Sequence, residues 1–559
     1  MKGLGILGTA AVLCAWTLGA GGQTRAITPV TDALIERPAP ADWLHWRRTL
    51  DGWAHSPLDQ INPRNAGRLQ LVWGWQLAPG TSQPGPLVHD GVMFVPQASG
   101  RVDALDGATG TLRWAYVPKF ERNPDISLAS RQRSLAIYGT TVIAAMPNAH
   151  LVALDAATGK VVWDYAVADD KLGYRYTSGP IVVKGKIVAG MTGCERYKDD
   201  VCFVSAHDPR SGRELWRVST IARPGEPGGD SWGNLPLNRR AGGDAWIPGS
   251  YDAGTGLMFW STAQAKPWAR VSRGTDGDAL YTNSVLAIDP DTGKVHWHRQ
   301  LVPGETYDLD EAFESVLVDR GGRRLLYKMG KLGILWQLDR ADGKFVAAHD
   351  LGYQTLVEVD AIAGRAVYKA DTLPKPGIEF KFCPDIEGVR GWQAMSYDPG
   401  TGALVIPIRP ACGTGVFFDK IDPNNIGAFS WYGNTTLNGA KMGPASPHPK
   451  MPDHRGELIS MDVDTGRVRW RLPMSAPATI SALTTAGGVA MSGDEDRNLY
   501  VVDTATGKSL FQTRLAAPLD GSAITYAVGG RQFIAVGTQG SGGRSGNAIY
   551  VFALPKGVE

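Results

Sequence analysis

The chain has 559 residues, of which 43% are hydrophobic and 20% charged, and its formal net charge is +2. The apolar fraction is ample for a core, and nothing in this charge balance indicates a nucleic-acid or anionic-membrane surface, which would need a basic stripe. The 69 glycines, 36 prolines and 18 tryptophans favour many short strands joined by tight turns.

The N-terminus has the pattern of a secretory signal. Lys2 precedes an uncharged apolar run over residues 4–18, small residues follow, and Ala26 offers a cleavage position. An uncleaved membrane anchor is the alternative, but the apolar run is shorter than the roughly 20 residues that a span needs. We therefore expect a signal peptide over 1–26, a single mature domain over 27–559, and no membrane span after cleavage.

Four cysteines remain in the expected mature chain, and none is part of a CxxC motif. An even number in an exported protein favours disulfides, and proximity in the sequence pairs Cys194 with Cys202 and Cys383 with Cys412. A metal site formed by these cysteines is the alternative, but their spacing does not match that of metal ligands. The chain also lacks a CxxCH motif, so it encodes no covalently attached c-type haem.

One phrase recurs along the chain, with a hydrophobic strand end, Asp, turn residues, Thr-Gly or a similar pair, and a second strand often closed by Trp. It reads ALDGATGTLRW (104–114), ALDAATGKVVW (153–163), AHDPRSGRELW (206–216), SYDAGTGLMFW (250–260), AIDPDTGKVHW (287–297), QLDRADGKFVA (337–347), SYDPGTGALVI (396–406), SMDVDTGRVRW (460–470) and VVDTATGKSLF (501–511).

The phrase describes a β-hairpin. Asp accepts hydrogen bonds from turn amides, Gly takes a positive φ, and the Trp is positioned to pack between neighbouring sheets. The spacing of about 40–50 residues is that of a four-stranded propeller blade. The sequence therefore predicts an all-β, eight-bladed β-propeller of four-stranded antiparallel blades, with short helices in loops. The phrases at 250–260 and 287–297 are close enough to share one blade.

Other motifs carry a family resemblance from about residue 43 to 552. They are GGDAWIPGSYD (242–252), LYTNSVLAIDPDTGKVHWH (280–298), GETYDLD (304–310) and GKLGILWQLDR (330–340). In these the chain resembles the pyrroloquinoline quinone (PQQ)-dependent alcohol dehydrogenases, the methanol and ethanol dehydrogenase family. The resemblance implies a periplasmic enzyme with PQQ, one metal ion and a small-molecule alcohol substrate. With no haem encoded, it also implies a separate electron acceptor, a soluble cytochrome c.

The resemblance assigns a set of cofactor contacts. Trp246 would be the floor on which the flat quinone stacks, although a Trp that only packs a blade is the alternative. Arg133 would pair with a quinone carboxylate, and Lys331 would stabilise the negative charge that develops on reduction, unless it is an ordinary surface lysine. The other implied contacts are Thr177, Thr192, Gly193, Cys194 and Trp392.

The resemblance also assigns the catalytic base and the metal ligands. Asp308 would remove the hydroxyl proton while hydride passes to the quinone C5, whose carbonyl the metal polarises. Glu195, Gln264, Asp308 and Asp310 would hold the metal, with Gln264 standing where the family usually has Asn. In an extended segment Asp308 and Asp310 point to one side. The extra Asp is typical of members that use a lanthanide instead of calcium. Without the resemblance, Glu195 and the Asp pair read as solvated loop carboxylates.

Several positions depart from the family pattern. Its adjacent cysteine pair falls at Ser127 and Leu128, a cofactor-contacting Glu is Gln83, and the residue before Trp392 is glycine instead of Asn. The substrate-pocket Trp is replaced within 537–543. These changes favour a wider pocket and alcohols larger than methanol. A quinoprotein sugar or aldehyde dehydrogenase, and a non-catalytic propeller that binds envelope proteins, are the competing hypotheses.

Overall fold

The computed structural model describes residues 26–81, 83–119, 131–195, 197–419, 439–540 and 546–557. The expected signal peptide, save Ala26, and the positions Ser127 and Leu128 lie outside these ranges. Within them the α-helices are α1 (Asp32–Glu36) and α2 (Arg270–Arg273), so the prediction of short helices is confirmed. No helix in the described part of the chain is long and apolar enough to cross a bilayer.

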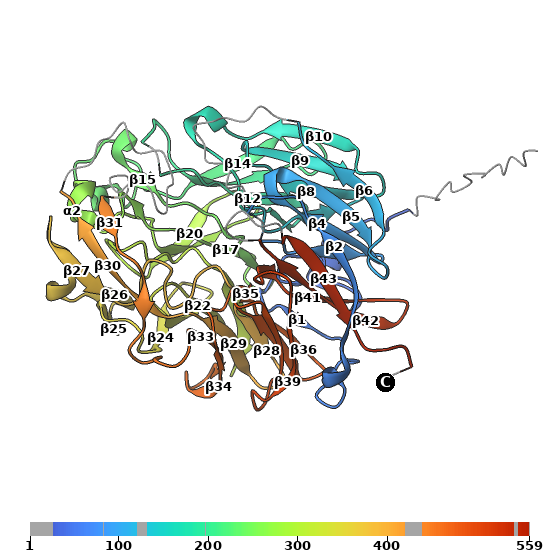
Figure 1. Ribbon diagram of the computed structural model, residues 1–559. Helices are drawn as coiled ribbons and strands as arrows, with labels where there is room; N and C mark the ends of the chain where they lie inside the picture. Colours follow the sequence, from blue (N-terminus) through green and yellow to red (C-terminus); the bar gives the residue numbers. More distant parts are fainter. Residues whose placement is uncertain are drawn as a thin grey trace, which may run out of the picture.

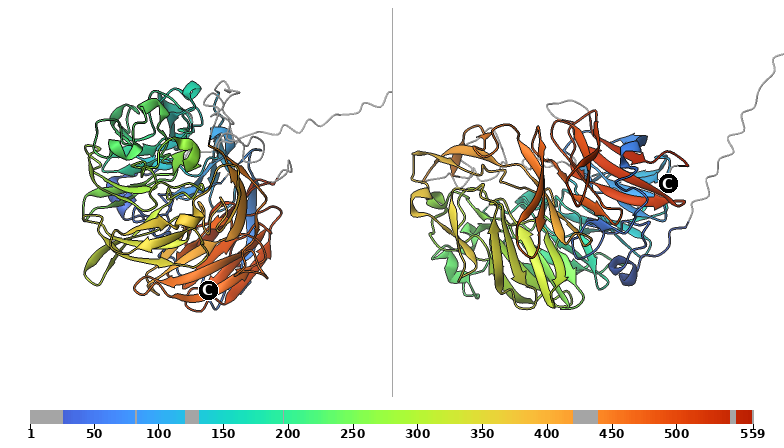
Figure 2. Two further views of the ribbon diagram at one scale, coloured as in Figure 1. Left: turned by 90° about the vertical axis from the view of Figure 1, so that its left-hand side faces the viewer. Right: turned by 90° about the horizontal axis from the view of Figure 1, so that it is seen from below.

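Four-stranded antiparallel sheets follow one another along the chain (Figures 1 and 2), which confirms the all-β prediction. The first three are β3 (Leu87–His89), β4 (Val92–Pro96), β5 (Val102–Asp106) and β6 (Leu112–Tyr116); β7 (Ala136–Tyr138), β8 (Thr141–Ala145), β9 (His150–Asp155) and β10 (Val161–Ala166); and β11 (Ile181–Val183), β12 (Lys186–Gly190), β13 (Phe203–His207) and β14 (Glu214–Ser219).

The sheets of the second half continue this pattern. They are β16 (Ser250–Asp252), β17 (Leu257–Ser261), β19 (Ser284–Ile288) and β20 (Val295–Gln300); β21 (Ser315–Arg320), β22 (Arg323–Met329), β23 (Ile334–Asp339) and β24 (Phe345–Asp350); β28 (Ser396–Asp398), β29 (Ala403–Ile408), β33 (Gly456–Asp462) and β34 (Val468–Met474); and β36 (Leu483–Thr485), β37 (Val489–Gly493), β38 (Asn498–Asp503) and β39 (Ser509–Arg514), which β1 (His55–Ser56) extends. The phrases at 250–260 and 287–297 do share one sheet.

The last sheet joins the two ends of the fold. It consists of β41 (Ile524–Val528), β42 (Arg531–Thr538), β43 (Ala548–Ala553) and, at its edge, β2 (Gln70–Gln76). β2 is antiparallel to β43, with Gln70 opposite Ala553 and Gln76 opposite Ala548. In Figure 1 the blue β2 accordingly lies beside the red β43.

Smaller sheets lie in the connections between these. They are β15 (Ala241–Gly242) with β18 (Ala265–Lys266); β25 (Val357–Asp360) with β26 (Arg365–Tyr368); β35 (Ile480–Ser481) with β40 (Gly521–Ser522); and β27 (Glu379–Phe382), β30 (Ala411–Phe417), β31 (Ala440–Met442) and β32 (Ser446–Pro447).

The recurring turn docks each sheet onto its neighbour. In the first phrase Asp106 Oδ1 accepts hydrogen bonds from the amides of Ala108 and Thr109, both at 3.1 Å. The Trp that closes this phrase, Trp114, donates its indole N–H to the Ala156 carbonyl in the turn of the next sheet, at 3.0 Å. Its ring lies against Gly159, where an added Cβ would be 2.5 Å from Trp114 Cε3. The predicted packing of Trp between sheets is therefore confirmed.

The same contact recurs from sheet to sheet. The pairs are Trp73 with Gly110, Trp163 with Gly212, Trp216 with Gly293, Trp297 with Gly343, and Trp470 with Gly507. Each glycine has a positive φ and faces an indole, so both the backbone conformation and the space require glycine. The consensus phrase thus encodes contacts between sheets as well as the hairpin within each.

Candidate functional site

The two aspartates of the GETYDLD motif share one lysine. Lys331, in the turn between β22 and β23, places Nζ 3.4 Å from Asp308 Oδ2 and 3.1 Å from Asp310 Oδ2. Lys331 Nζ also donates to the Asp308 carbonyl at 2.6 Å. All three side chains are buried. Both carboxylates therefore face the same ammonium group, and Asp308 has φ +64° and is not extended as the sequence suggested.

Gln264 lies against the same pair of aspartates. Its side-chain amide donates to Asp308 Oδ1, and its backbone amide donates to Asp310 Oδ1 at 3.2 Å. Two residues on, Lys266 Nζ lies 3.8 Å from Asp308 Oδ1. Asp308 is thus surrounded by a carboxamide and two ammonium groups, in a position with little access to solvent.

Glu195 is paired with an arginine. Arg175 Nη2 donates to Glu195 Oε1 at 2.5 Å. Burial alone would raise the pKa of Glu195, but the charge and hydrogen bond of Arg175 outweigh it and hold the pKa at about 2. Glu195 is therefore anionic, with Oε1 engaged by Arg175.

Asp244, which the sequence did not single out, links the Glu195 loop to the Trp246 loop. Its Oδ1 accepts from the amides of Gly193 and Cys194, at 2.8 and 3.2 Å. The Asp244 backbone carbonyl accepts from Ala263 at 2.9 Å. Burial, followed by the neighbouring Glu195 charge, raises the pKa of Asp244.

The predicted quinone floor is in contact with the predicted quinone cation. Arg133 Cζ lies over the Trp246 ring, 4.8 Å from its centroid, and Arg133 Nη1 donates to the Thr177 carbonyl at 3.0 Å. Phe313 meets the same indole edge-on, with ring centroids 5.4 Å apart. Three of the predicted cofactor residues, from separate loops, are therefore brought together.

The remaining predicted cofactor residues have mixed surroundings. Thr192 is buried and donates its hydroxyl to the Arg175 carbonyl at 2.7 Å. Cys194 is bonded to Cys202. Trp392 is half-buried against the main hydrophobic core. Of these, Thr192 and Cys194 also fix the loop that carries Glu195.

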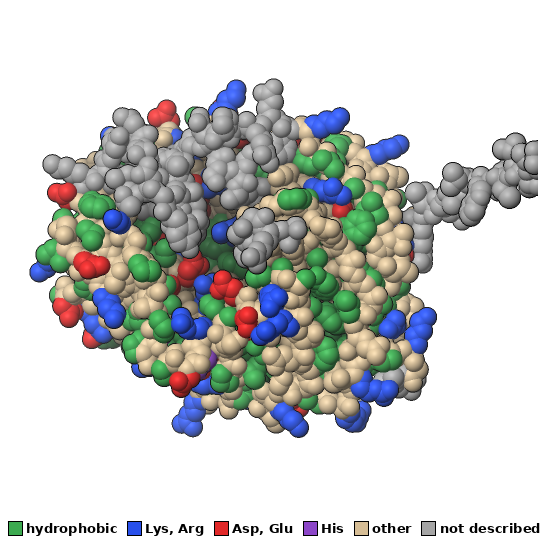
Figure 3. All heavy atoms as spheres, in the orientation of Figure 1, with side chains coloured by type: hydrophobic (Ala, Val, Ile, Leu, Met, Phe, Trp, Pro, Cys, Tyr) green, Lys and Arg blue, Asp and Glu red, His purple; other side chains and the backbone are tan. Residues whose placement is uncertain are grey.

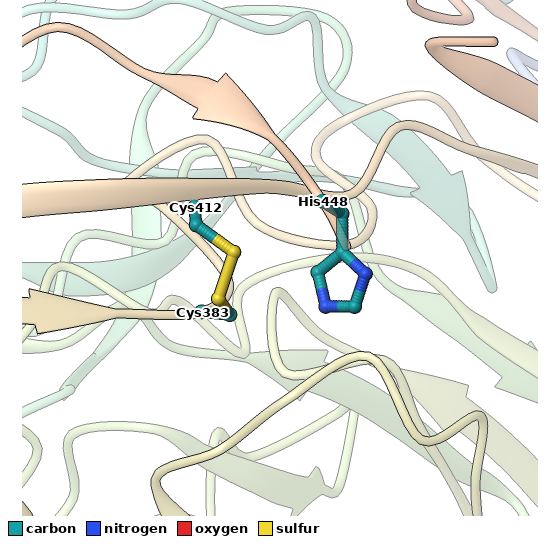
Figure 4. Close-up of side chains that lie close together, drawn as sticks. All are labelled: Cys383, Cys412 and His448. Carbon is teal, nitrogen blue, oxygen red and sulfur yellow. A yellow bond between two sulfur atoms is a disulfide. The ribbon is translucent and has the colours of Figure 1, made fainter. Parts of the chain in front are cut away.

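Both predicted disulfides are confirmed, Cys194–Cys202 and Cys383–Cys412. His448 lies beside the second one (Figure 4), and Asp244 lies close to the first. In both groups the sulfurs are bonded to each other and offer no thiolate to a metal. The carboxylate groups of Glu195, Asp308 and Asp310 are thus the better candidates for a cation.

The loop that carries Asp308 has a support that the sequence reading missed. Glu305 Oε1 accepts from the backbone amides of Tyr307 and Leu309, the second at 3.0 Å. Arg273 Nη2 donates to the Glu305 carbonyl. Glu305 lies within GETYDLD and Asp244 within GGDAWIPGSYD, so these motifs were a signal for both residues, whereas Lys266 lies in neither.

The side chains of the site are of the chemical types that a bound quinone and a hard cation need. Near the predicted contacts, Arg133 Nε, Ser178 Oγ and Gln393 Oε1 are buried and have no hydrogen-bond partner among the described residues. Carboxylate and carboxamide oxygens are suitable ligands for a hard cation, and the ammonium groups around Asp308 show that the site accepts positive charge. On the face in Figure 3, acidic and basic side chains are interspersed over the coloured residues.

Three comparisons identify related proteins. The family model described as glucose/ethanol/alcohol dehydrogenase, beta-propeller domain, matches residues 43–350 and 358–534. Quinohemoprotein alcohol dehydrogenase ADH IIB of Pseudomonas putida is 30% identical over 524 residues, covering 89% of this chain and 73% of that protein. The 1-butanol dehydrogenase (cytochrome c) of Thauera butanivorans is 30% identical and covers 90% of this chain and 76% of that protein.

A solved structure agrees. Quinohemoprotein alcohol dehydrogenase ADHIIG of Pseudomonas putida HK5 superposes with a TM-score of 0.83 at 26% identity, over 95% of this chain and 83% of that one. The match of fold and of sequence over nearly the whole chain confirms the resemblance. The chain belongs to the PQQ-dependent, or quinoprotein, alcohol dehydrogenase family of β-propeller enzymes.

Proposed function

We propose that this chain is a periplasmic alcohol dehydrogenase in which Asp308 is the general base. The observation that carries the proposal is the burial of the Asp308 carboxylate among Gln264, Lys266 and Lys331. Burial raises the pKa of Asp308 to about 6, with Lys331 acting in the opposite direction. A base with a pKa near the working pH accepts a proton readily and is still ionised at neutral pH.

The residues divide into binding and catalytic roles. Trp246, Arg133, Thr177, Thr192, Gly193, Cys194 and Trp392 would hold the quinone, and Glu195, Gln264, Asp308 and Asp310 would hold the metal ion. When bound, the quinone supplies the hydride acceptor, and the metal polarises its carbonyl group. Asp308 takes the proton from the alcohol hydroxyl, and Lys331 stabilises negative charge that develops next to it.

The blade number, the export of the chain and its electron acceptor are part of the same proposal. We infer that the four-stranded sheets are the eight blades of one propeller domain over 27–559, with residues 1–26 removed on export. The relative from Thauera butanivorans is a 1-butanol dehydrogenase (cytochrome c), which supports a soluble cytochrome c as electron acceptor here too. The replacement of a pocket Trp within 537–543 supports alcohols larger than methanol as substrates.

The test is reconstitution of the purified full chain with PQQ and either Ca²⁺ or La³⁺, followed by reduction of an artificial dye with a series of alcohols. We expect alcohol-dependent dye reduction, with primary alcohols larger than methanol as the better substrates. Absence of reduction with either metal, although PQQ is bound, would refute the assignment. A preference for methanol would refute only the substrate class.

A further inference from the structure

Lys266 is a buried cation that the assigned site does not use. Its relative exposure is 6%, and its Nζ lies 3.8 Å from Asp308 Oδ1. Its Nζ also lies 5.7 Å from the centroid of the Trp268 ring. The buried ammonium group thus faces both the Asp308 carboxylate and the Trp268 ring.

The backbone of Lys266 is held close to the Glu195 loop. Lys266 pairs with Ala241 in the β15–β18 sheet. The next residue of β15, Gly242, donates its amide to the Cys194 carbonyl at 2.7 Å. A Cβ added at Gly242 would be 2.4 Å from the Gln264 carbonyl oxygen and 2.8 Å from Lys266 N. The backbone of β15 therefore lies between the segments that carry Glu195 and Lys266 and contacts both.

Two ammonium groups lie at the two oxygens of the Asp308 carboxylate. Lys266 Nζ lies 3.8 Å from Asp308 Oδ1, and Lys331 Nζ lies 3.4 Å from Asp308 Oδ2. Lys331 Nζ also lies 3.1 Å from Asp310 Oδ2. Lys266 is therefore the cation that faces the Asp308 oxygen on the side of Gln264.

The carboxylates of Glu195, Asp308 and Asp310 are farther apart than the ligands of a single ion. Oxygens bound to one Ca²⁺ at 2.3–2.6 Å lie within about 5 Å of one another. Within the described residues, the ligand atoms of Glu195, Asp308 and Asp310 are not a group that all lie within 4.8 Å of one another. A cation that binds them must draw them together, and like charges at short range in a buried site repel strongly.

We propose that Lys266 is a built-in competitor of the metal ion. Its ammonium balances the acidic residues until a metal binds, and metal binding requires the ammonium to turn away from Asp308. Lys266 thereby lowers the affinity of the site for a metal ion. It also raises the metal concentration that is needed to fill the site. This inference rests on the metal-binding role proposed above.

The experiment compares metal affinity in the full chain without quinone, with Ca²⁺ measured by calorimetry and Tb³⁺ by luminescence. Lys266→Met removes the charge and retains a stem of similar length against Trp268. We expect this variant to bind either ion on the order of tenfold more tightly than wild type. Lys266→Arg, which keeps the charge, should stay near the wild-type affinity. The control Lys344→Met removes an exposed lysine paired with Asp342 and should change nothing.

Further measurements distinguish a folding defect, or a failure of the proposed function, from a failure of the inference about Lys266. If Lys266→Met fails to fold, Lys266→Gln replaces it, and Ca²⁺ should raise the thermal midpoint of the neutral variant more than that of wild type. Equal metal affinity and equal thermal shifts in wild type and neutral variants would overturn the inference. Dye reduction by reconstituted wild type tests the proposed function independently, and it can succeed while the competition by Lys266 is refuted.

Discussion

Arg133 lies over the face of Trp246, with Cζ 4.8 Å from the ring centroid. The sequence assigned these residues different tasks toward the same ligand, one stacking against the quinone ring and the other pairing with a carboxylate. A guanidinium above an indole is a favourable contact in its own right. Because burial lowers the pKa of Arg133 to about 9, an anionic partner would stabilise its charge. The contact therefore supports one binding site in which Trp246 stacks against the quinone ring and Arg133 pairs with a quinone carboxylate.

Replacing Trp246 with Ala removes the flat surface on which the quinone would stack. Aromatic stacking contributes about 0.5–1.5 kcal/mol beyond area burial, so PQQ should bind at least roughly tenfold more weakly. Fluorescence titration with PQQ measures this. Trp114→Phe is the control, because Trp114 joins two sheets and should affect stability while leaving quinone affinity unchanged. Unaltered PQQ affinity in Trp246→Ala would exclude the floor assignment.

Replacing Asp308 with Asn removes the proposed base and keeps the shape of the side chain. General-base catalysis contributes about 10²–10⁴-fold, so the turnover of alcohol in the dye assay should fall by that factor while PQQ still binds. Asp342→Asn, at an exposed turn, should retain full activity. Near-normal turnover in Asp308→Asn would assign the proton transfer to another group.

Replacing Gly159 with Ala tests the contact between sheets. The new Cβ would lie 2.5 Å from Trp114 Cε3 at a φ of +71°, so we expect a loss of about 2–4 kcal/mol in unfolding free energy from overpacking and backbone strain. Gly225→Ala is a matched control, with φ +81° and nothing within 4 Å of its Cβ. It should show only the strain. Equal losses in denaturant melts would mean that the Trp contact adds nothing.

His89 gives the fold a defined pH dependence. Burial would lower the pKa of His89, but its hydrogen bond and ion pair with Asp42, at 3.0 Å, outweigh burial and raise it. A raised folded-state pKa stabilises the fold fully below the unfolded value of about 6.5, and the contribution is lost as the pH rises through the folded value.

The difference in unfolding free energy between wild type and His89→Gln should therefore be largest near pH 5.5 and shrink toward pH 8. Denaturant melts across this range measure it. Asp42→Asn should reduce the pH-dependent part of the difference and leave the contributions of Thr28 and Asp90. A difference that grows with pH would contradict the sign of the shift.

The roles of residues that belong to a short repeated motif could be predicted from the sequence. Asp106, Gly159 and Trp114 belong to a repeated phrase whose hairpin, turn and sheet contact follow from short-range geometry. The even cysteines likewise gave both disulfides. In the site, GETYDLD identified the loop that carries Asp308, and Lys331 does meet it.

Long-range contacts were not predictable in the same way. Lys266 comes two residues after Gln264 and directly before a proline, and the sequence alone assigns it no role. It is buried because the two-residue pairing of β15 with β18 turns it toward Asp308. Asp244 is similar, since its role depends on amides about 50 residues earlier. The positive φ of Asp308 also depends on its surroundings, as Glu305 holds the flanking amides.

The pairing of β2 with β43 has a consequence for incomplete chains. β2 is made early, and its neighbour in the sheet is β43, the last of the described strands. Until β43 is made, β2 is an edge with unpaired amides and carbonyls, a template for association with other molecules. A product shortened before Ala548 would keep that edge open and leave β42 uncovered as well. Strand β43 thus distinguishes closed molecules from aggregation-prone fragments.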